Sequence, residues 1–179
     1  MKRLLFSLVA LMAVMAIQAQ SICGSWQLMQ PKVINEGDGH VIISYIHTFN
    51  EDGTFYSDAD VTLSSKPAKT KEKEIAVSGT IKGTYTLEGD QLKMFVNVNT
   101  FNLELVSMSE NGKVLDIDNP DLRSRINGVL TKEGKAKMAE SLVDDSYTIK
   151  VTANGQMLEL TDTKDGEVER LMRIATVKH

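Results

Sequence analysis

Most of the chain after residue 40 alternates between apolar and polar side chains with a period of two residues. In the first such segment the apolar face is interrupted by the polar sequence Asn50–Gly53, which predicts a turn between two strands. The apolar positions of this face are Val41, Ile43, Tyr45, Phe49, Phe55, Ala59 and Val61. One face toward a core and one toward water is typical of antiparallel strands. The segment is therefore predicted to be a β-hairpin.

The clearest strand pattern covers residues 75–87. Its apolar face holds Ile75, Val77, Ile81, Tyr85 and Leu87, and its polar face holds serine, threonine and lysine. Gly79 and Gly83 lie on the apolar side, where a missing side chain permits the bend or bulge that a closing sheet needs. The segment favours a barrel over a flat sheet.

The same alternation returns in the rest of the chain, separated by short turns rich in glycine, asparagine and aspartate. The apolar positions are Leu92, Met94, Val96 and Val98, then Phe101, Leu103 and Leu105, and later Tyr147, Ile149, Val151, Leu158 and Leu160. A last strand is expected from Val168 to Val177. Strands joined by short turns predict an all-β, mainly antiparallel fold, an up-and-down β-barrel.

Residues 119–143 change to helical spacing and form a helical insert before the last three strands. Asn119 suits the N-cap and Pro120 the first helical position. An apolar stripe follows at Leu122, Ile126 and Leu130, and a second short helix is expected through Met138 and Leu142. We expect the insert to cover one end or flank of the barrel, with a lid over a ligand as the alternative.

The start of the chain has the order of a secretory signal. Two basic residues precede an apolar run that ends at Ile17, which is shorter than the roughly 20 residues of a membrane span. Cleavage is predicted after Ala19, which gives a signal peptide of residues 1–19 and a single domain of residues 20–179. No transmembrane segment is expected after signal removal, and the protein is predicted to be periplasmic or secreted.

The lone cysteine, Cys23, raises the alternative of a lipoprotein. A lipid-attachment signal requires a small residue directly before the cysteine, and Ile22 stands there instead, so acylation is not expected. One cysteine also cannot form an internal disulfide.

The charge and the motifs of the sequence argue against nucleic-acid binding, zinc binding and catalysis. The net charge of −4 and the lack of a basic patch argue against nucleic acid as a partner. His40 and His47 are the only histidines before the terminal residue, and their spacing forms no zinc signature. No nucleophile elbow or phosphate-binding glycine loop is present. The sequence therefore predicts neither an enzyme nor a cofactor.

Three carboxylates lie close together before the helical insert, at Asp116, Asp118 and Asp121. They could supply oxygen ligands for calcium, but they lack the spacing and the closing glutamate of an EF-hand. Helix capping and the helix dipole explain Asn119 and Asp121 equally well. No metal site is predicted.

The sequence Gly24-Ser25-Trp26 at the start of the first strand resembles the opening of the lipocalins and of bacterial lipocalin-like domains. Further similar phrases are Phe49-Asn50-Glu51-Asp52-Gly53-Thr54-Phe55, Gly83-Thr84-Tyr85 and Gly89-Asp90-Gln91-Leu92. The resemblance implies a calycin-type β-barrel. The insert at residues 119–143 and the missing lipocalin disulfide depart from that family, so a related calycin barrel and an open sandwich stay as alternatives.

The resemblance also implies that Trp26, with Gly24 beside it, closes one end of the barrel beneath an arginine of the last strand. Two arginines could take this place. Arg170 is in phase with the apolar positions of that strand, whereas Arg173 lies closer to where antiparallel pairing puts the partner of Trp26. We expect Arg173, together with a β-bulge that corrects its phase.

Two functions remain open. In the first, the barrel interior binds a small apolar ligand. The candidate lining residues are Tyr45, Phe49, Phe55, Tyr85, Leu92, Met94, Phe101 and Leu103. In the second, side chains fill the barrel, and its outer face or loops bind a protein or a glycan at the cell envelope. The volume of the interior discriminates between them.

Overall fold

The computed structural model describes residues 22–65, 72–141 and 145–175. The predicted signal peptide lies outside these ranges, as does Leu142. In chain order the elements are β1 (Gly24–Leu28), β2 (Lys32–Glu36), β3 (Gly39–Phe49), β4 (Thr54–Ser65), β5 (Lys73–Glu88), β6 (Gln91–Glu110), β7 (Lys113–Val114), α2 (Pro120–Ser141), β8 (Asp145–Thr152), the 3-10 turn η1 (Ala153–Gly155), β9 (Met157–Asp162) and β10 (Val168–Ile174). The fold is mostly antiparallel β with a helix before the last three strands, which confirms the predicted fold class.

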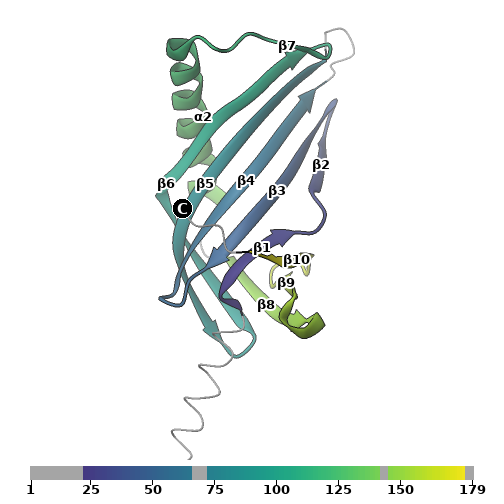
Figure 1. Cartoon of the computed structure of the whole chain (residues 1–179), viewed down its shortest axis with the longest axis vertical. Helices are drawn as coiled ribbons and strands as arrows, with labels where there is room; N and C mark the ends of the chain where they lie inside the picture. The colour runs from purple at the N-terminus through teal and green to yellow at the C-terminus, as the bar shows by residue number, and fades with distance from the viewer. Residues whose placement is uncertain (1–21, 66–71, 142–144, 176–179) are drawn as a thin grey trace, which may run out of the picture.

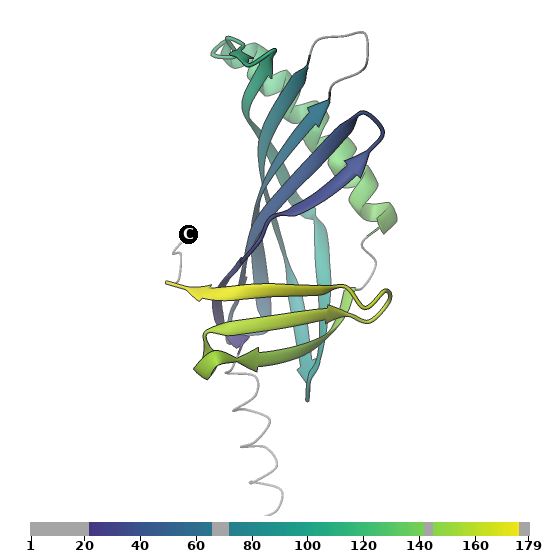
Figure 2. The ribbon, with the colours of Figure 1, turned by 90° about the vertical axis from the view of Figure 1, so that its right-hand side faces the viewer.

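Eight of these strands form a hydrogen-bonded ring. The order around the sheet is β1, β10, β9, β8, β6, β5, β4 and β3, and β1 pairs with β3 to close it. The closing pairs are few: β1 meets β3 at residues 24–27, and β6 meets β8 at residues 91–94. In Figure 2, β8, β9 and β10 cross the long strands at one end of the molecule. The ring is therefore barrel-like at that end alone.

Beyond the ring, β3, β4, β5 and β6 continue as a long open sheet, with β2 paired to the far part of β3. Helix α2 lies along the far part of β6 (Figure 1). Asn127 accepts a hydrogen bond from the Leu105 N–H at 2.8 Å, and Thr131 accepts one from the Leu103 N–H at 3.0 Å. Arg123 donates to the Leu105 carbonyl at 2.7 Å. Helical side chains thus satisfy backbone groups that a neighbouring strand would otherwise pair with.

In the described part of the insert one helix runs without a break from Pro120 to Ser141, where two helices were expected. Its start agrees with the prediction. Pro120 is the first helical residue, and the Asn119 side chain accepts hydrogen bonds from the N–H groups of Asp121 and Leu122 at 3.0 and 3.1 Å. The helix covers a flank of the sheet.

Two glycines of β5 permit close approach between strands. A Cβ atom on Gly83 would lie 2.2 Å from the Phe95 carbonyl, and one on Gly79 would lie 2.7 Å from a methyl group of Leu103. The irregular register near them comes from extra residues in β6, opposite residues 76–77 and 80–82 of β5. The expected irregularity is therefore present, but β6 carries it.

Among the described residues, the buried apolar side chains form two separate clusters. In the closed end, Trp26, Phe49, Phe55, Leu92 and Leu158 are each at most 2% exposed and pack with neighbouring apolar side chains. A smaller cluster around Val77, Leu105 and Ile117 lies beneath α2.

The phase predicted for the last strand is wrong. Leu171 is fully buried, and Glu169 and Arg173 lie on the same face, whereas Val168, Arg170 and Met172 point outward. The outer face of β10 carries apolar residues and its inner face carries charged ones. A prediction that places the apolar face inside therefore assigns the wrong face of this strand to the interior. The register of β10 with β1 and β9 is continuous, so no bulge is needed to bring Arg173 inward.

A candidate apolar groove between the helix and the sheet

Seven of the eight candidate lining residues divide into two groups. Phe49, Phe55, Tyr85, Leu92 and Met94 are at most 8% exposed and pack against one another in the closed end. Phe49 meets Tyr85 edge to face with ring centroids 5.1 Å apart, and the Tyr85 hydroxyl donates to the Asn50 carbonyl at 2.7 Å. These side chains fill the closed end themselves.

Phe101 and Leu103 line a cavity of about 380 Å³ where the open sheet meets α2. We call it the groove. Its other lining residues are Ser57, Ala59, Val61, Leu63, Val77, Gly79, Thr80, Ile81, Leu130, Glu133 and Gly134. The volume lies within the roughly 300–1,000 Å³ range of small-molecule sites. The floor of the groove is the same face of the sheet that forms the barrel interior in the closed end.

Most of these lining residues were not predicted as ligand-binding, although several lie on faces that the sequence pattern predicts to be apolar. Ala59, Val61 and Val77 belong to the alternating apolar face, and Leu130 to the helical stripe. Gly134 brings α2 close to the sheet, because a Cβ atom there would lie 2.4 Å from the Phe101 ring. The alternation identifies the inward face but leaves open which part of it is packed and which part is open.

At the end nearest the closed end, which we call its lower end, the groove borders a group of polar side chains. Ser57 is 7% exposed, and its hydroxyl lies 2.6 Å from Nδ1 of His47 on the adjacent strand. Burial lowers the pKa of His47 to about 4, so the imidazole is neutral near pH 7. The Tyr45 ring is tilted by 36° to that imidazole, with the ring centroids 4.4 Å apart.

Tyr45, the remaining candidate, lies between the groove and the closed end. Its hydroxyl donates a hydrogen bond to the Glu169 carboxylate. Burial, and then the charge of Glu169, raise the pKa of Tyr45 well above its usual range. Tyr45 therefore stays neutral and anchors β3 to β10.

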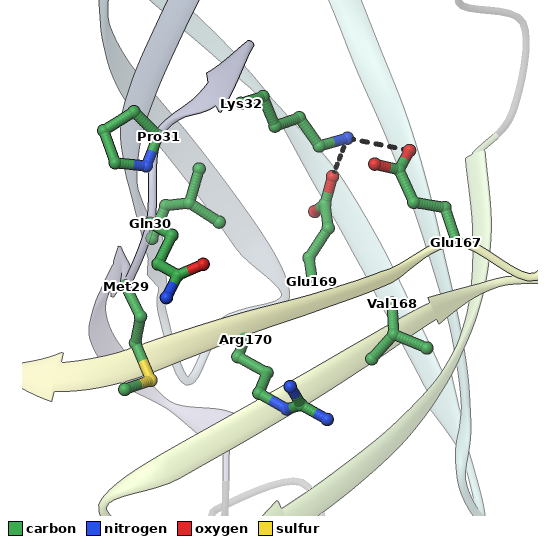
Figure 3. Close-up of a pocket in the computed structure, with 9 residues that line it drawn as sticks. Met29, Gln30, Pro31, Lys32, Glu167, Val168, Glu169 and Arg170 are labelled. Carbon is green, nitrogen blue, oxygen red and sulfur yellow. Dashed lines mark hydrogen bonds and ion pairs between the residues drawn. The ribbon is translucent and has the colours of Figure 1, made fainter.

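The seam between β2 and β10 holds a second cavity, of about 310 Å³, which Figure 3 shows. Lys32 reaches across this seam to Glu169, and its ammonium group lies 3.1 Å from the Glu167 carboxylate. Burial acts to lower the pKa of Lys32, but the two carboxylates raise it above the usual value. Because these charged groups pair with one another, the seam is an ion-pair contact that connects the strands.

The two arginines considered for barrel closure take different places. The Arg173 guanidinium lies 4.3 Å from the centre of the Trp26 ring, and the two residues face each other in the β1–β10 register. Arg173 donates to the carbonyls of Cys23 and Gly155, each at 2.9 Å. Arg170 points outward and pairs with Glu159 at 3.0 Å.

Trp26 is fully buried, and its indole N–H donates to the Ile22 carbonyl at 2.6 Å. Gly24, on the same strand, has a φ of 120°, which a side chain rarely adopts, and a Cβ atom there would lie 3.1 Å from the Arg173 guanidinium. Glycine at this position thus lets the guanidinium reach over the ring.

No group of three or more His, Cys, Asp or Glu side chains suited to a metal ion is present among the described residues. Within the same residues, no helix is long and apolar enough to cross a membrane.

The sequence was also compared with protein families and with curated proteins. No family model matches this chain, and no curated protein matches it significantly. The groove and its surrounding residues are therefore the basis for inferring a function.

Proposed function

We propose that this chain is an exported, lipocalin-like binding protein that carries a small apolar molecule in the groove and performs no catalysis. The observation that carries the proposal is a cavity of about 380 Å³ with mostly apolar lining, directly above a closed end that its own side chains fill. A packed lower end supplies a rigid scaffold. A ligand in the groove would bury apolar surface that otherwise meets water, at roughly 25 cal/mol per Å².

The kinship with lipocalins is supported by the stack of Arg173 on Trp26 at the closed end. The groove replaces the open mouth of a complete barrel. Here α2 takes the position beside β6 that another strand would need, and the concave face between the helix and β4 stays accessible. Leu63, at the end of this face, is 39% exposed.

Export is supported by the apolar run at the start of the chain. The burial of Ile22 indicates where the signal peptide is cleaved. Ile22 is fully buried and supplies the acceptor for the Trp26 indole. Cleavage before Cys23, as lipid attachment requires, would remove this residue. A cut after Ala19 keeps it, so we propose a mature protein that is not acylated.

The proposal is tested by titrating the purified mature protein with N-phenyl-1-naphthylamine, a neutral apolar dye whose fluorescence rises in apolar surroundings. We expect saturable binding of one dye per chain. Ala59→Phe places a ring in the groove and should weaken binding at least tenfold. Thr62→Phe adds the same ring to the opposite face of β4 and should leave binding unchanged.

Two results would overturn the proposal: no saturable binding by the wild-type protein, or equal binding by both variants. Either would favour the filled barrel that binds a protein or a glycan.

A further inference from the structure

The charges around the groove restrict the ligand that it can hold. Among the described lining residues one side chain is ionisable, Glu133 of α2, and it is exposed. None of those lining residues is a cation. An anionic group drawn into the groove would lose its hydration without gaining a counterion, which is unfavourable.

The buried polar side chain of the lining is Ser57, since Thr80 and Glu133 are both exposed. Ser57 lines the groove, and its hydroxyl contacts Nδ1 of His47. With a neutral imidazole, two arrangements are open. If Nδ1 accepts, the Ser57 oxygen can accept from a ligand, and if Nδ1 donates, the Ser57 hydroxyl can donate to a ligand.

A hydroxyl group on the ligand fits both arrangements, because it can donate or accept. A carbonyl fits the arrangement in which Ser57 donates. A charged group could also hydrogen-bond to Ser57, but it would gain no counterion at this end of the groove, since the Glu169 carboxylate and the Lys32 ammonium are paired with each other. The lower end of the groove is thus polar and uncharged, while its walls are apolar.

We propose, building on the proposed function, that the groove selects uncharged apolar molecules ending in a hydroxyl or carbonyl group, and that Ser57, positioned by His47, binds that polar end. The ligand class is then a neutral lipid-like alcohol or ketone. Fatty acids and alkyl amines of the same length should bind more weakly, because placing their charged end beside Ser57 desolvates the charge without a counterion. The lining carboxylate of Glu133 is exposed to water, so pairing with it would compensate an amine only weakly.

The test is a displacement series with the same dye and four molecules of equal chain length: 1-decanol, 2-decanone, decanoate and decylamine at pH 7.5. We expect decanol and decanone to displace the dye at concentrations about tenfold lower than the two charged molecules. Such a factor is the size expected from one hydrogen bond together with the charge penalty.

Variants then assign the effect to the residue. Ser57→Ala should weaken decanol binding about three- to tenfold while leaving the affinity for the dye within twofold. Ser57→Thr keeps a hydroxyl and should retain the preference for decanol. Ser78→Ala removes a hydroxyl from the opposite face of β5 and should have no effect.

The outcomes separate the two proposals. Dye binding together with equal or stronger displacement by decanoate or decylamine overturns this inference and leaves the apolar-ligand function standing. Dye binding with an unchanged decanol affinity in Ser57→Ala overturns the role of Ser57. Failure of the wild-type protein to bind the dye or any of the four molecules overturns both proposals.

Discussion

Removing the Arg173 side chain should destabilise the closed end far more than removing that of Arg170. Arg173→Ala deletes two charge-assisted hydrogen bonds of 2.9 Å, to the carbonyls of Cys23 and Gly155, and the stack at 4.3 Å on Trp26. Hydrogen bonds to charged groups contribute about 1.5–3 kcal/mol each, and a partly desolvated cation–π contact about 1–2 kcal/mol. Because contacts of one side chain are not additive, we expect a loss of about 3 kcal/mol.

Two companion variants separate the causes. Arg170→Ala removes one ion pair from a side chain that is 62% exposed, and should cost less than about 1 kcal/mol. Arg173→Lys keeps the charge but loses the planar fork that reaches two carbonyls, and should recover about half of the loss.

The assay is urea denaturation followed by the fluorescence of Trp26, the chain's single tryptophan, which reports directly on this stack. Thermal unfolding should agree. A domain of about 160 residues loses roughly 2–4 °C per kcal/mol, so Arg173→Ala should unfold about 6–12 °C lower. A loss below about 1 kcal/mol, or a loss equal to that of Arg170→Ala, would show that the contacts of Arg173 do not stabilise the closed end.

Three further predictions follow from single residues. His47 has a pKa near 6.5 in the unfolded chain, but burial lowers its pKa in the folded protein to about 4. Between these two pH values the unfolded state binds more protons than the folded state, so the free energy of unfolding falls as the pH drops. Urea denaturation at pH 7 and pH 4 should show a loss of up to about 3 kcal/mol that His47→Gln lacks, and an equal loss in both proteins would contradict the assignment. Asn127→Ala removes the acceptor of the Leu105 N–H, so hydrogen exchange at that amide should accelerate at a cost of about 1 kcal/mol, whereas unchanged exchange would argue against docking of α2 on β6. The intact mass of the exported protein should include Ile22, and a lipid-modified mass beginning at Cys23 would contradict the proposed cleavage.

The sequence was a sound guide where burial and hydrophobicity agree. The alternating faces of β3, β4 and β5 and the cap and first turn of α2 are placed as predicted, because their apolar side chains point inward. In β10 the relation is inverted: Glu169 and Arg173 point inward with partners, while Val168 and Met172 are 48% and 50% exposed. Only pairing with β1 and β9 fixes that phase.

The groove itself could not be located from the sequence. Phe101 and Leu103 have the same alternation as Leu92 and Met94, yet the first pair lines a cavity and the second is packed. The difference arises where β6 leaves the ring and α2 replaces a strand beside it. That depends on contacts between segments far apart in the chain. Strand β2 was missed for a related reason, since its five residues show little alternation and depend on β3 for pairing.

The groove is proposed to carry a small apolar molecule. The most direct test is native mass spectrometry of the mature protein purified from its own host, followed by mild denaturation and extraction into organic solvent. We expect one uncharged apolar molecule per chain, released on unfolding and absent from the Ala59→Phe variant. A mass equal to that of the bare polypeptide, with no gain in thermal stability from any neutral lipid offered, would contradict it.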